Sequence, residues 1–158
     1  MDISPLTLLP PDGAWVPGTH HEPGASVFGG DHRPVVMIVD DDDGIANLLA
    51  DLLTDEGYRV VVARDGLAAL RGVRRERPAM VLTDCMMPGL DGVEFLRELR
   101  RHPSTRTIPV VLMSSSRPRN PALADVPFLA KPFDVDDVLE IVARYAFAPS
   151  LSPLYGEG

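Results

Sequence analysis

Short apolar runs alternate with amphipathic segments between residues 34 and 146, and this alternation limits the fold more than any other feature of the chain. A continuous apolar run of about five residues is typical of a strand that is buried on both faces. Apolar residues that recur at helical spacing between the runs predict helices that cover such a sheet. Strand and helix in alternation predict an α/β fold with a parallel sheet and helices on both of its faces.

The apolar runs predict five strands: Val35–Val39, Tyr58–Val62, Met80–Thr83, Pro109–Met113 and Phe128–Ala130. Between the first two strands, one helix face is predicted from five apolar residues: Ile45, Leu48, Leu49, Leu52 and Leu53. Gly57 stands where the C-terminal cap of this helix would lie. The last helix is expected to begin near Asp134, with five residues on its apolar side: Val135, Val138, Leu139, Val142 and Tyr145.

Two further helices are predicted from their N-terminal signals. Asp65 is expected to cap a helix that ends before Pro78. Asp91 is followed three residues later by Glu94, which is the spacing of a capping box. Arginine-rich stretches lie in both helices, and we interpret them as solvent-exposed helix faces.

Composition narrows the class of protein. A chain of 158 residues with 45% hydrophobic residues is long enough for one globular domain. The net charge of −8 argues against a general nucleic-acid-binding protein, and no apolar run is long enough to cross a membrane. A single cysteine, Cys85, excludes an intramolecular disulfide, and we expect this residue to be buried and unreactive. With no signal peptide visible, a cytoplasmic location is expected.

We expect three parts along the chain. Residues 1–33 are rich in Pro and Gly and predict a flexible tail, residues 34–146 form the domain, and residues 147–158 form a second short tail. No further domain is expected after the last helix.

Charged and polar residues stand where the predicted strands end. Asp40–Asp43 follow the first strand, and Asp84, Ser114 and Lys131 follow the third, fourth and fifth. In a parallel sheet these ends meet at one edge, where ligand sites form. One of the four consecutive aspartates, Asp43, is expected to cap the following helix. Clustered carboxylates repel one another, so a lysine and a divalent cation are expected to offset them; oxygen ligands alone suit Mg²⁺.

Four motifs at these strand ends resemble bacterial response-regulator receiver domains, over about residues 33–145. They are Val39-Asp40-Asp41, the stretch from Asp84 through Pro88 to Gly92, the stretch from Pro109 to Ser114, and Lys131-Pro132-Phe133. The resemblance implies a flavodoxin-like, doubly wound sheet of strand order 2-1-3-4-5. It also implies a signalling protein rather than an enzyme, one that accepts a phosphoryl group from a sensor histidine kinase or a phosphotransfer protein.

The resemblance also implies roles for individual residues. Asp84 would be the phosphoacceptor, assisted by Lys131 and the hydroxyl of Ser114. Mg²⁺ would be held by four groups: the carboxylates of Asp40, Asp41 and Asp84 and the backbone carbonyl of Met86. Ser114 and Phe128 would form the conformational switch, and the Lys131–Pro132 peptide would be cis.

The segment between Ser114 and Phe128 departs from the family pattern. It holds only 13 residues, including three prolines, so a full fourth helix does not fit. Asn120 and Pro121 favour a single helical turn instead. Two alternatives to a phosphorylated switch follow: a receiver-like protein that binds a partner without phosphorylation, and an aspartate-dependent phosphohydrolase of similar topology.

Overall fold

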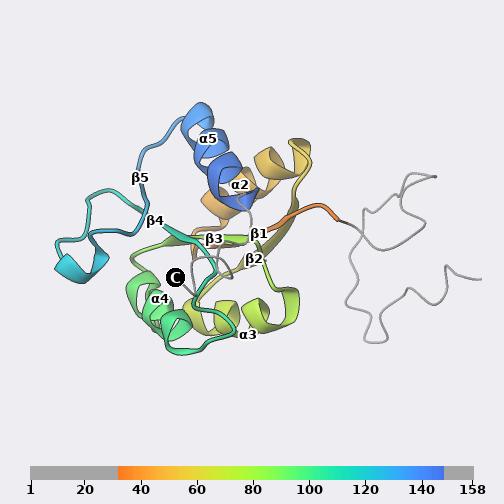
Figure 1. The fold of residues 1–158 in the computed structure, drawn as a ribbon. Helices are drawn as coiled ribbons and strands as arrows, with labels where there is room; N and C mark the ends of the chain where they lie inside the picture. The colour runs from red at the N-terminus through yellow and green to blue at the C-terminus, as the bar shows by residue number, and fades with distance from the viewer. Residues whose placement is uncertain (1–31, 148–158) are drawn as a thin grey trace, which may run out of the picture. The chain divides into compact units, whose positions relative to one another are not determined.

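The structure, a computed structural model, describes residues 32–147, so the two predicted tails lie almost wholly outside it. The described residues form a five-stranded parallel sheet of order β2-β1-β3-β4-β5, which confirms the predicted fold and strand order (Figure 1). The strands are β1 (Val35–Val39), β2 (Arg59–Ala63), β3 (Met80–Asp84), β4 (Val110–Ser114) and β5 (Phe128–Ala130). The helices are α2 (Asp43–Asp55), α3 (Gly66–Glu76), α4 (Gly92–Arg101) and α5 (Val135–Ala146), with a 3₁₀ turn η1 (Pro121–Leu123).

Strand register explains small differences from the predicted bounds. β1 and β5 begin and end where predicted, whereas β2 and β4 are each shifted by one residue. Val35 pairs with Arg59, so β2 starts one residue after Tyr58. Val110 is the first residue of β4 to pair with β3, opposite Val81. Pairing with the neighbouring strands sets where β2 and β4 begin, and an apolar run in the sequence does not reveal this pairing.

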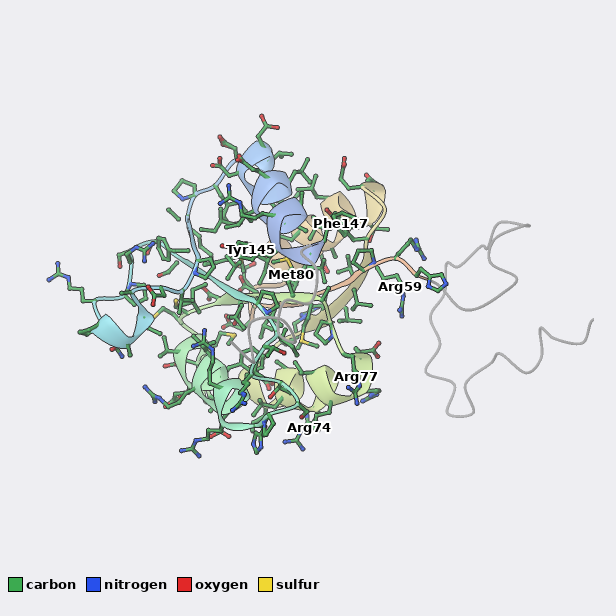
Figure 2. The ribbon with its side chains drawn as sticks, in the orientation of Figure 1. Arg59, Arg74, Arg77, Met80, Tyr145 and Phe147 are labelled. Atoms are coloured by element: carbon green, nitrogen blue, oxygen red, sulfur yellow. The ribbon has the colours of Figure 1, made fainter. Side chains whose placement is uncertain are left out.

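Alternate side chains of the central strands enter two separate cores. On one face of the sheet, Met37, Val39 and Val81 pack with residues of α3 and α4. On the other face, Val36, Ile38 and Leu82 pack with residues of α2 and α5. Figure 1 shows the two helix pairs on opposite faces of the sheet, and Figure 2 shows Met80 inside and Arg74 and Arg77 outside. No helix of the described residues is long and apolar enough to span a membrane.

The helix starts confirm two predicted caps and correct a third. Asp65 and Asp91 cap α3 and α4, and Asp91 forms the predicted capping box with Glu94. α2 is capped by Asp42 rather than Asp43: the Asp42 carboxylate accepts a hydrogen bond from the Ile45 backbone N–H. Asp42 holds the extended backbone that a cap requires, while Asp43 is already the first helical residue.

Two residues predicted for apolar helix faces are exposed instead. Leu48 of α2 is 61% exposed, and Val135 at the start of α5 is 52% exposed. In α2 the buried residues are Ala46, Leu49 and Leu53, so the stripe that faces the sheet is narrower than the predicted one and includes a small residue. The prediction was therefore wrong for Leu48 and Val135.

The segment between β4 and β5 holds one turn of helix, as predicted. Asn120 caps η1 by accepting a hydrogen bond from the Ala122 backbone N–H at 2.8 Å. Leu123 is buried and joins the core on the α3 and α4 face. This turn takes the place of a full helix beside β5.

Candidate functional site

Three carboxylates meet at the carboxyl ends of β1 and β3. Asp40 and Asp41 directly follow β1, and Asp84 is the last residue of β3. Oxygen atoms of these three residues lie within 4.8 Å of one another. Asp40 is fully buried, Asp84 is 7% exposed and Asp41 is exposed. The structure thus brings together the three carboxylates that the sequence predicted to meet.

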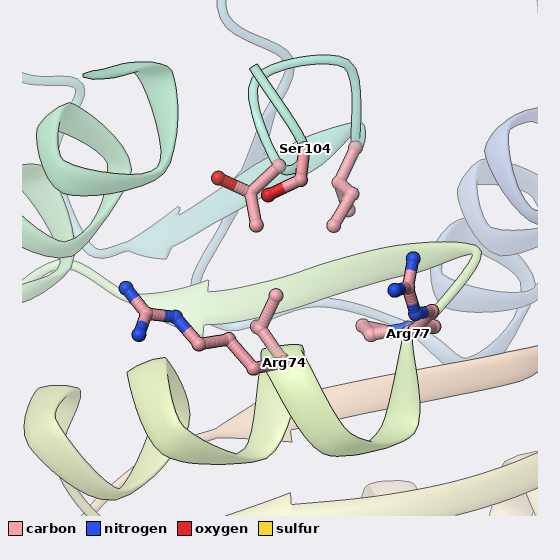
Figure 3. Close-up of a pocket in the computed structure, with 7 residues that line it drawn as sticks. Arg74, Arg77 and Ser104 are labelled. Atoms are coloured by element: carbon pink, nitrogen blue, oxygen red, sulfur yellow. The ribbon is translucent and has the colours of Figure 1, made fainter. Parts of the chain in front are cut away.

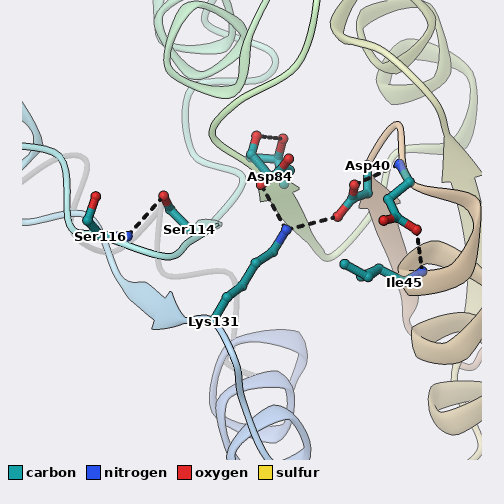
Figure 4. Close-up of polar contacts among 8 residues, drawn as sticks. Asp40, Ile45, Asp84, Ser114, Ser116 and Lys131 are labelled. Carbon is teal, nitrogen blue, oxygen red and sulfur yellow. Dashed lines mark hydrogen bonds and ion pairs between the residues drawn. The ribbon is translucent and has the colours of Figure 1, made fainter.

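Lys131 contacts two of these carboxylates from the end of β5 (Figure 4). Its Nζ atom donates to Asp84 Oδ1 at 3.0 Å and to Asp40 Oδ2 at 3.5 Å. Its backbone N–H donates to the Ser114 carbonyl at 2.9 Å, which ties it to β4. The Lys131–Pro132 peptide is cis, as predicted. The Lys131 ammonium group therefore contacts two carboxylates, which precede it in the sequence by 91 and 47 positions.

Burial and charge act in opposite directions on the ionisable groups of this cluster. Burial raises the pKa of Asp40, against the backbone N–H of Asp42 and the charge of Lys131. Burial alone would lower the pKa of Lys131, but its hydrogen bond to Asp84 and the charge of Asp40 raise the pKa overall. The lysine is thus held in its charged form by the two carboxylates that it contacts.

Backbone packing fixes Asp84 in place. The Cys85 N–H donates to the Met113 carbonyl at 3.0 Å, so pairing with β4 continues beyond Asp84. Gly92 lies against the end of β3: a Cβ atom at this position would stand 2.2 Å from the Asp84 carbonyl oxygen. Only a glycine allows α4 to start this close to the site.

The remaining predicted site residues surround the cluster. Ser114 is 7% exposed at the end of β4, and its Oγ accepts a hydrogen bond from the Ser116 N–H at 3.4 Å. Phe128 is half-buried at the start of β5, with the Arg117 guanidinium 4.7 Å from its ring centre. Met86 follows Asp84 by two residues, and its side chain is 73% exposed. The predicted metal contact of the Met86 carbonyl stays a prediction.

Cys85 and Arg64 complete the surroundings. Cys85 is 4% exposed, as predicted, and burial raises the pKa of its thiol to about 11. Arg64, which follows β2, forms an ion pair with Asp43, and this pair was missed from the sequence. The only signal was a basic residue two positions after the second predicted strand, at the same edge of the sheet.

The cluster offers ligands that suit a hard divalent cation. Its donors are carboxylate oxygens alone, without the nitrogen or sulfur ligands that transition metals favour. One of the three, Asp41, is open to solvent, which leaves room for bound water. The residues present therefore fit a magnesium ion.

Comparison with known proteins gives the family. A family model for the response regulator receiver domain matches residues 36–143. Sporulation initiation phosphotransferase F of Bacillus subtilis (strain 168) is 36% identical over 115 residues, which are 70% of this chain and 91% of that protein. Response regulator PleD of Caulobacter vibrioides is 39% identical over 109 residues, 66% of this chain but only 24% of PleD.

Solved structures agree with this assignment. A receiver domain of a sensor histidine kinase from Pseudomonas aeruginosa PAO1, described with magnesium coordinated in its active-site cleft, has a TM-score of 0.67 and 28% identity, and the match covers 73% of this chain and 99% of that one. Chemotaxis protein CheY4 of Vibrio cholerae has a TM-score of 0.67 and 26% identity, with 72% and 98% covered. The chain therefore belongs to the receiver domains of two-component response regulators.

Proposed function

We propose that this receiver domain takes a phosphoryl group onto Asp84 and changes its surface in response. The observation that carries the proposal is the contact of Asp84 with Lys131 at 3.0 Å, beside two further carboxylates at one sheet edge. The donor would be a phosphohistidine of a sensor kinase or of a phosphotransfer protein. The phosphorus–nitrogen bond breaks and an Asp84 oxygen–phosphorus bond forms. The imidazole leaves as the neutral ring, because its other nitrogen already carries a proton.

The metal would be held by the side chains of Asp40, Asp41 and Asp84 together with the Met86 carbonyl. When bound, Mg²⁺ would supply positive charge against the phosphoryl oxygens. Lys131 already offsets part of the negative charge of Asp84 and Asp40, and it would hold the acceptor carboxylate in position. The Ser114 hydroxyl, one residue beyond the pairing of Asp84 with Met113, would donate to a phosphoryl oxygen.

The response would begin at Ser114 and Phe128. Both residues lie at ends of the neighbouring strands β4 and β5, and they border the short segment that holds η1. A shift of Ser114 toward the phosphoryl group would change the packing of this segment. Signalling would then proceed by protein contact with a surface that differs from one carrying a full helix.

A second candidate is a receiver that binds its partner without phosphorylation. The one observation that favours it is the single turn η1 in place of a helix between β4 and β5. The complete set of Asp40, Asp41, Asp84 and Lys131 at one sheet edge favours phosphorylation.

Intact-mass measurement after incubation with Mg²⁺ and a small acyl phosphate separates the two candidates. We expect a gain of one phosphoryl group that is lost in Asp84→Asn and after metal removal. The matched control is Asp42→Asn, because Asn caps a helix as well as Asp and this carboxylate caps α2. Absence of the gain, with kinase as well as acyl phosphate as donor, would favour the second candidate.

A further inference from the structure

A cavity of about 380 Å³ lies at the opposite end of the sheet from the carboxylates (Figure 3). It opens between the C-terminal end of α3 and the loop that joins α4 to β4. Its lining residues are Val73, Arg74, Arg77, Pro78, Ser104, Thr105 and Ile108. This volume falls in the range of about 300–1,000 Å³ that small-molecule sites occupy.

The cavity combines an apolar floor with two cationic side chains. Val73 is 1% exposed and Pro78 is buried, so the floor belongs to the domain core. Arg74 and Arg77 extend toward opposite sides of the cavity, and Ser104 lies on the facing wall (Figure 3). Such walls suit a ligand with an apolar body and an anionic group.

Among the described residues, no carboxylate neutralises these two arginines. Glu76, the one acidic residue of α3, lies 4.0 Å from Arg59. In α4, Glu98 pairs with Arg101 at 3.5 Å, and Glu94 is engaged in the capping box. The charge of Arg74 and Arg77 is therefore left for a ligand, in a chain whose net charge is −8.

Both walls are held in place by local hydrogen bonds. Arg77 has φ of 48°, a left-handed conformation that favours glycine, and its N–H donates to the Val73 carbonyl at 2.9 Å. On the facing wall, Thr105 Oγ1 donates to the Leu99 carbonyl at 2.7 Å, and the Ile108 N–H donates to the Thr105 carbonyl. These hydrogen bonds fix the backbone of both walls, whereas the side chains of Arg74 and Arg77 are exposed.

An ordinary structural role accounts for only part of this arrangement. Arg74 lies in the last turn of α3, where a basic side chain complements the helix dipole. Arg77 lies beyond that turn. Interaction with the helix dipole also involves neither the apolar floor nor the Ser104 hydroxyl.

The geometry points to a binding site for a small organic phosphate with an apolar body. Phosphate fits because a guanidinium presents its N–H groups as a planar fork that matches phosphate oxygens. The apolar body would lie on Ile108, the half-buried apolar side chain of the lining, beside the buried Val73 and Pro78. This site lies apart from Asp84, so its existence does not depend on the proposed phosphorylation.

Amide chemical-shift titration of the full chain tests the site, with adenosine monophosphate, inorganic phosphate and adenosine as probes. The titrations would be done without Mg²⁺, so that the carboxylate cluster stays out of the measurement. We expect saturable shifts at residues 73–78 and 104–108, with adenosine monophosphate bound at least about tenfold more tightly than either other probe. Shifts spread over both arginine-rich helices, or equal affinities for adenosine monophosphate and inorganic phosphate, would overturn the proposal.

Two pairs of substitutions separate this site from general attraction to a basic surface. Arg74→Gln with Arg77→Gln should weaken adenosine monophosphate binding at least about tenfold. Arg71→Gln with Arg75→Gln removes the same charge from exposed positions of α3 outside the cavity, and binding should stay within about twofold of wild type. Equal losses in both variants would contradict a defined site.

A third variant changes volume and leaves charge unaltered. Ser104 is exposed, so Ser104→Trp should fold and fill the cavity. It should abolish the localised shifts, and its thermal unfolding should match that of the wild type. Binding of adenosine monophosphate that persists in folded Ser104→Trp would overturn the proposal even if the double variants prove unstable. Binding of an acidic peptide in place of adenosine monophosphate would also overturn it, in favour of a protein-binding surface.

Discussion

The two ends of the sheet differ in charge and in the way their charged side chains are held. At the carboxyl end, Asp40 and Asp84 stand on or next to buried strands and are 0% and 7% exposed. At the amino end, Arg74 and Arg77 stand on the end of a helix and are exposed. Charges on strand ends are fixed by strand pairing, whereas charges on helix ends are fixed only by their own turn.

This difference explains why one end suits phosphoryl chemistry and the other suits reversible binding. Phosphoryl transfer requires groups held in position and neutralised by charge, which the contacts of Lys131 with two carboxylates supply. Exposed arginines are partly screened by solvent and salt, so a ligand would dissociate from them readily. Parallel strands place these two kinds of site at opposite ends of one domain.

The strongest test of the rigid end is Gly92→Ala. A Cβ atom at residue 92 would stand 2.2 Å from the Asp84 carbonyl oxygen, so α4 or the end of β3 must move. We expect the free energy of unfolding to fall by about 3 kcal/mol, as in overpacked cores. Urea unfolding measures this change.

Gly72→Ala is the matched control for that substitution. Its Cβ would meet only the terminal methyl of Met37 at 2.9 Å, which can rotate away. Better helix propensity offsets this crowding by up to about 1 kcal/mol, so the stability should stay near that of the wild type. Equal losses in the two variants would show that the end of β3 is no more rigid than the rest of the sheet.

The second test removes the cation of the carboxylate cluster. Lys131→Met leaves Asp40 and Asp84 without their shared partner, and in metal-free buffer we expect a loss of about 2 kcal/mol in unfolding free energy. This figure is smaller than for a fully buried pair because the Lys131 side chain is 22% exposed. Arg64→Met, which breaks an exposed pair with Asp43, should cost less than about 0.5 kcal/mol.

Magnesium binding provides a third test, because it should stabilise one end of the sheet only. At about ten times its dissociation constant, Mg²⁺ should raise the unfolding free energy by about 1.4 kcal/mol. Asp41→Asn should reduce this gain, since it removes the solvent-exposed carboxylate of the cluster. Arg74→Gln with Arg77→Gln should leave it intact. Thermal unfolding with and without Mg²⁺ gives both results, and a gain unchanged in Asp41→Asn would place the ion elsewhere.

The carboxylate end was accessible to sequence reasoning for a physical reason. Strands buried on both faces give continuous apolar runs, and the residue that ends each run is therefore placed at the sheet edge. Asp40, Asp84, Ser114 and Lys131 all followed from this rule, and the three ionisable ones are in mutual contact or proximity. The short turn η1 followed from the prolines of its segment.

The amino end was not accessible in the same way. Arg74 and Arg77 were interpreted as parts of a solvated helix face, because helical spacing does not show which loop packs beside a helix end. The cavity depends on residues 104–108, which lie about thirty positions away and reach α3 only through the fold. The same limit applies to Leu48 and Val135, whose exposure is set by neighbouring elements rather than by their period.

The smallest predicted effect on stability concerns Tyr58. This residue directly precedes β2 and packs in the core on the α2 and α5 face of the sheet. Tyr58 is 6% exposed, and its ring centre lies 5.6 Å from that of Phe147. Burial, followed by the charge of Glu56, raises the pKa of its phenol above the ordinary value of 10.0. The folded protein therefore keeps this proton at a pH where the unfolded chain loses it.

This pKa shift predicts that Tyr58 makes a contribution to the unfolding free energy that is fully present below about pH 10. The contribution is lost as pH rises through the pKa of Tyr58 in the folded state. Tyr58→Phe keeps the ring and removes the titration, so its unfolding free energy should fall less between about pH 9 and pH 11. Cys85 and Lys131 also have raised pKa values and destabilise the fold in the same range, but they do so equally in both proteins. The difference between the two urea-unfolding curves therefore isolates Tyr58. Parallel curves would mean that the phenol ionises as readily in the fold as in the unfolded chain.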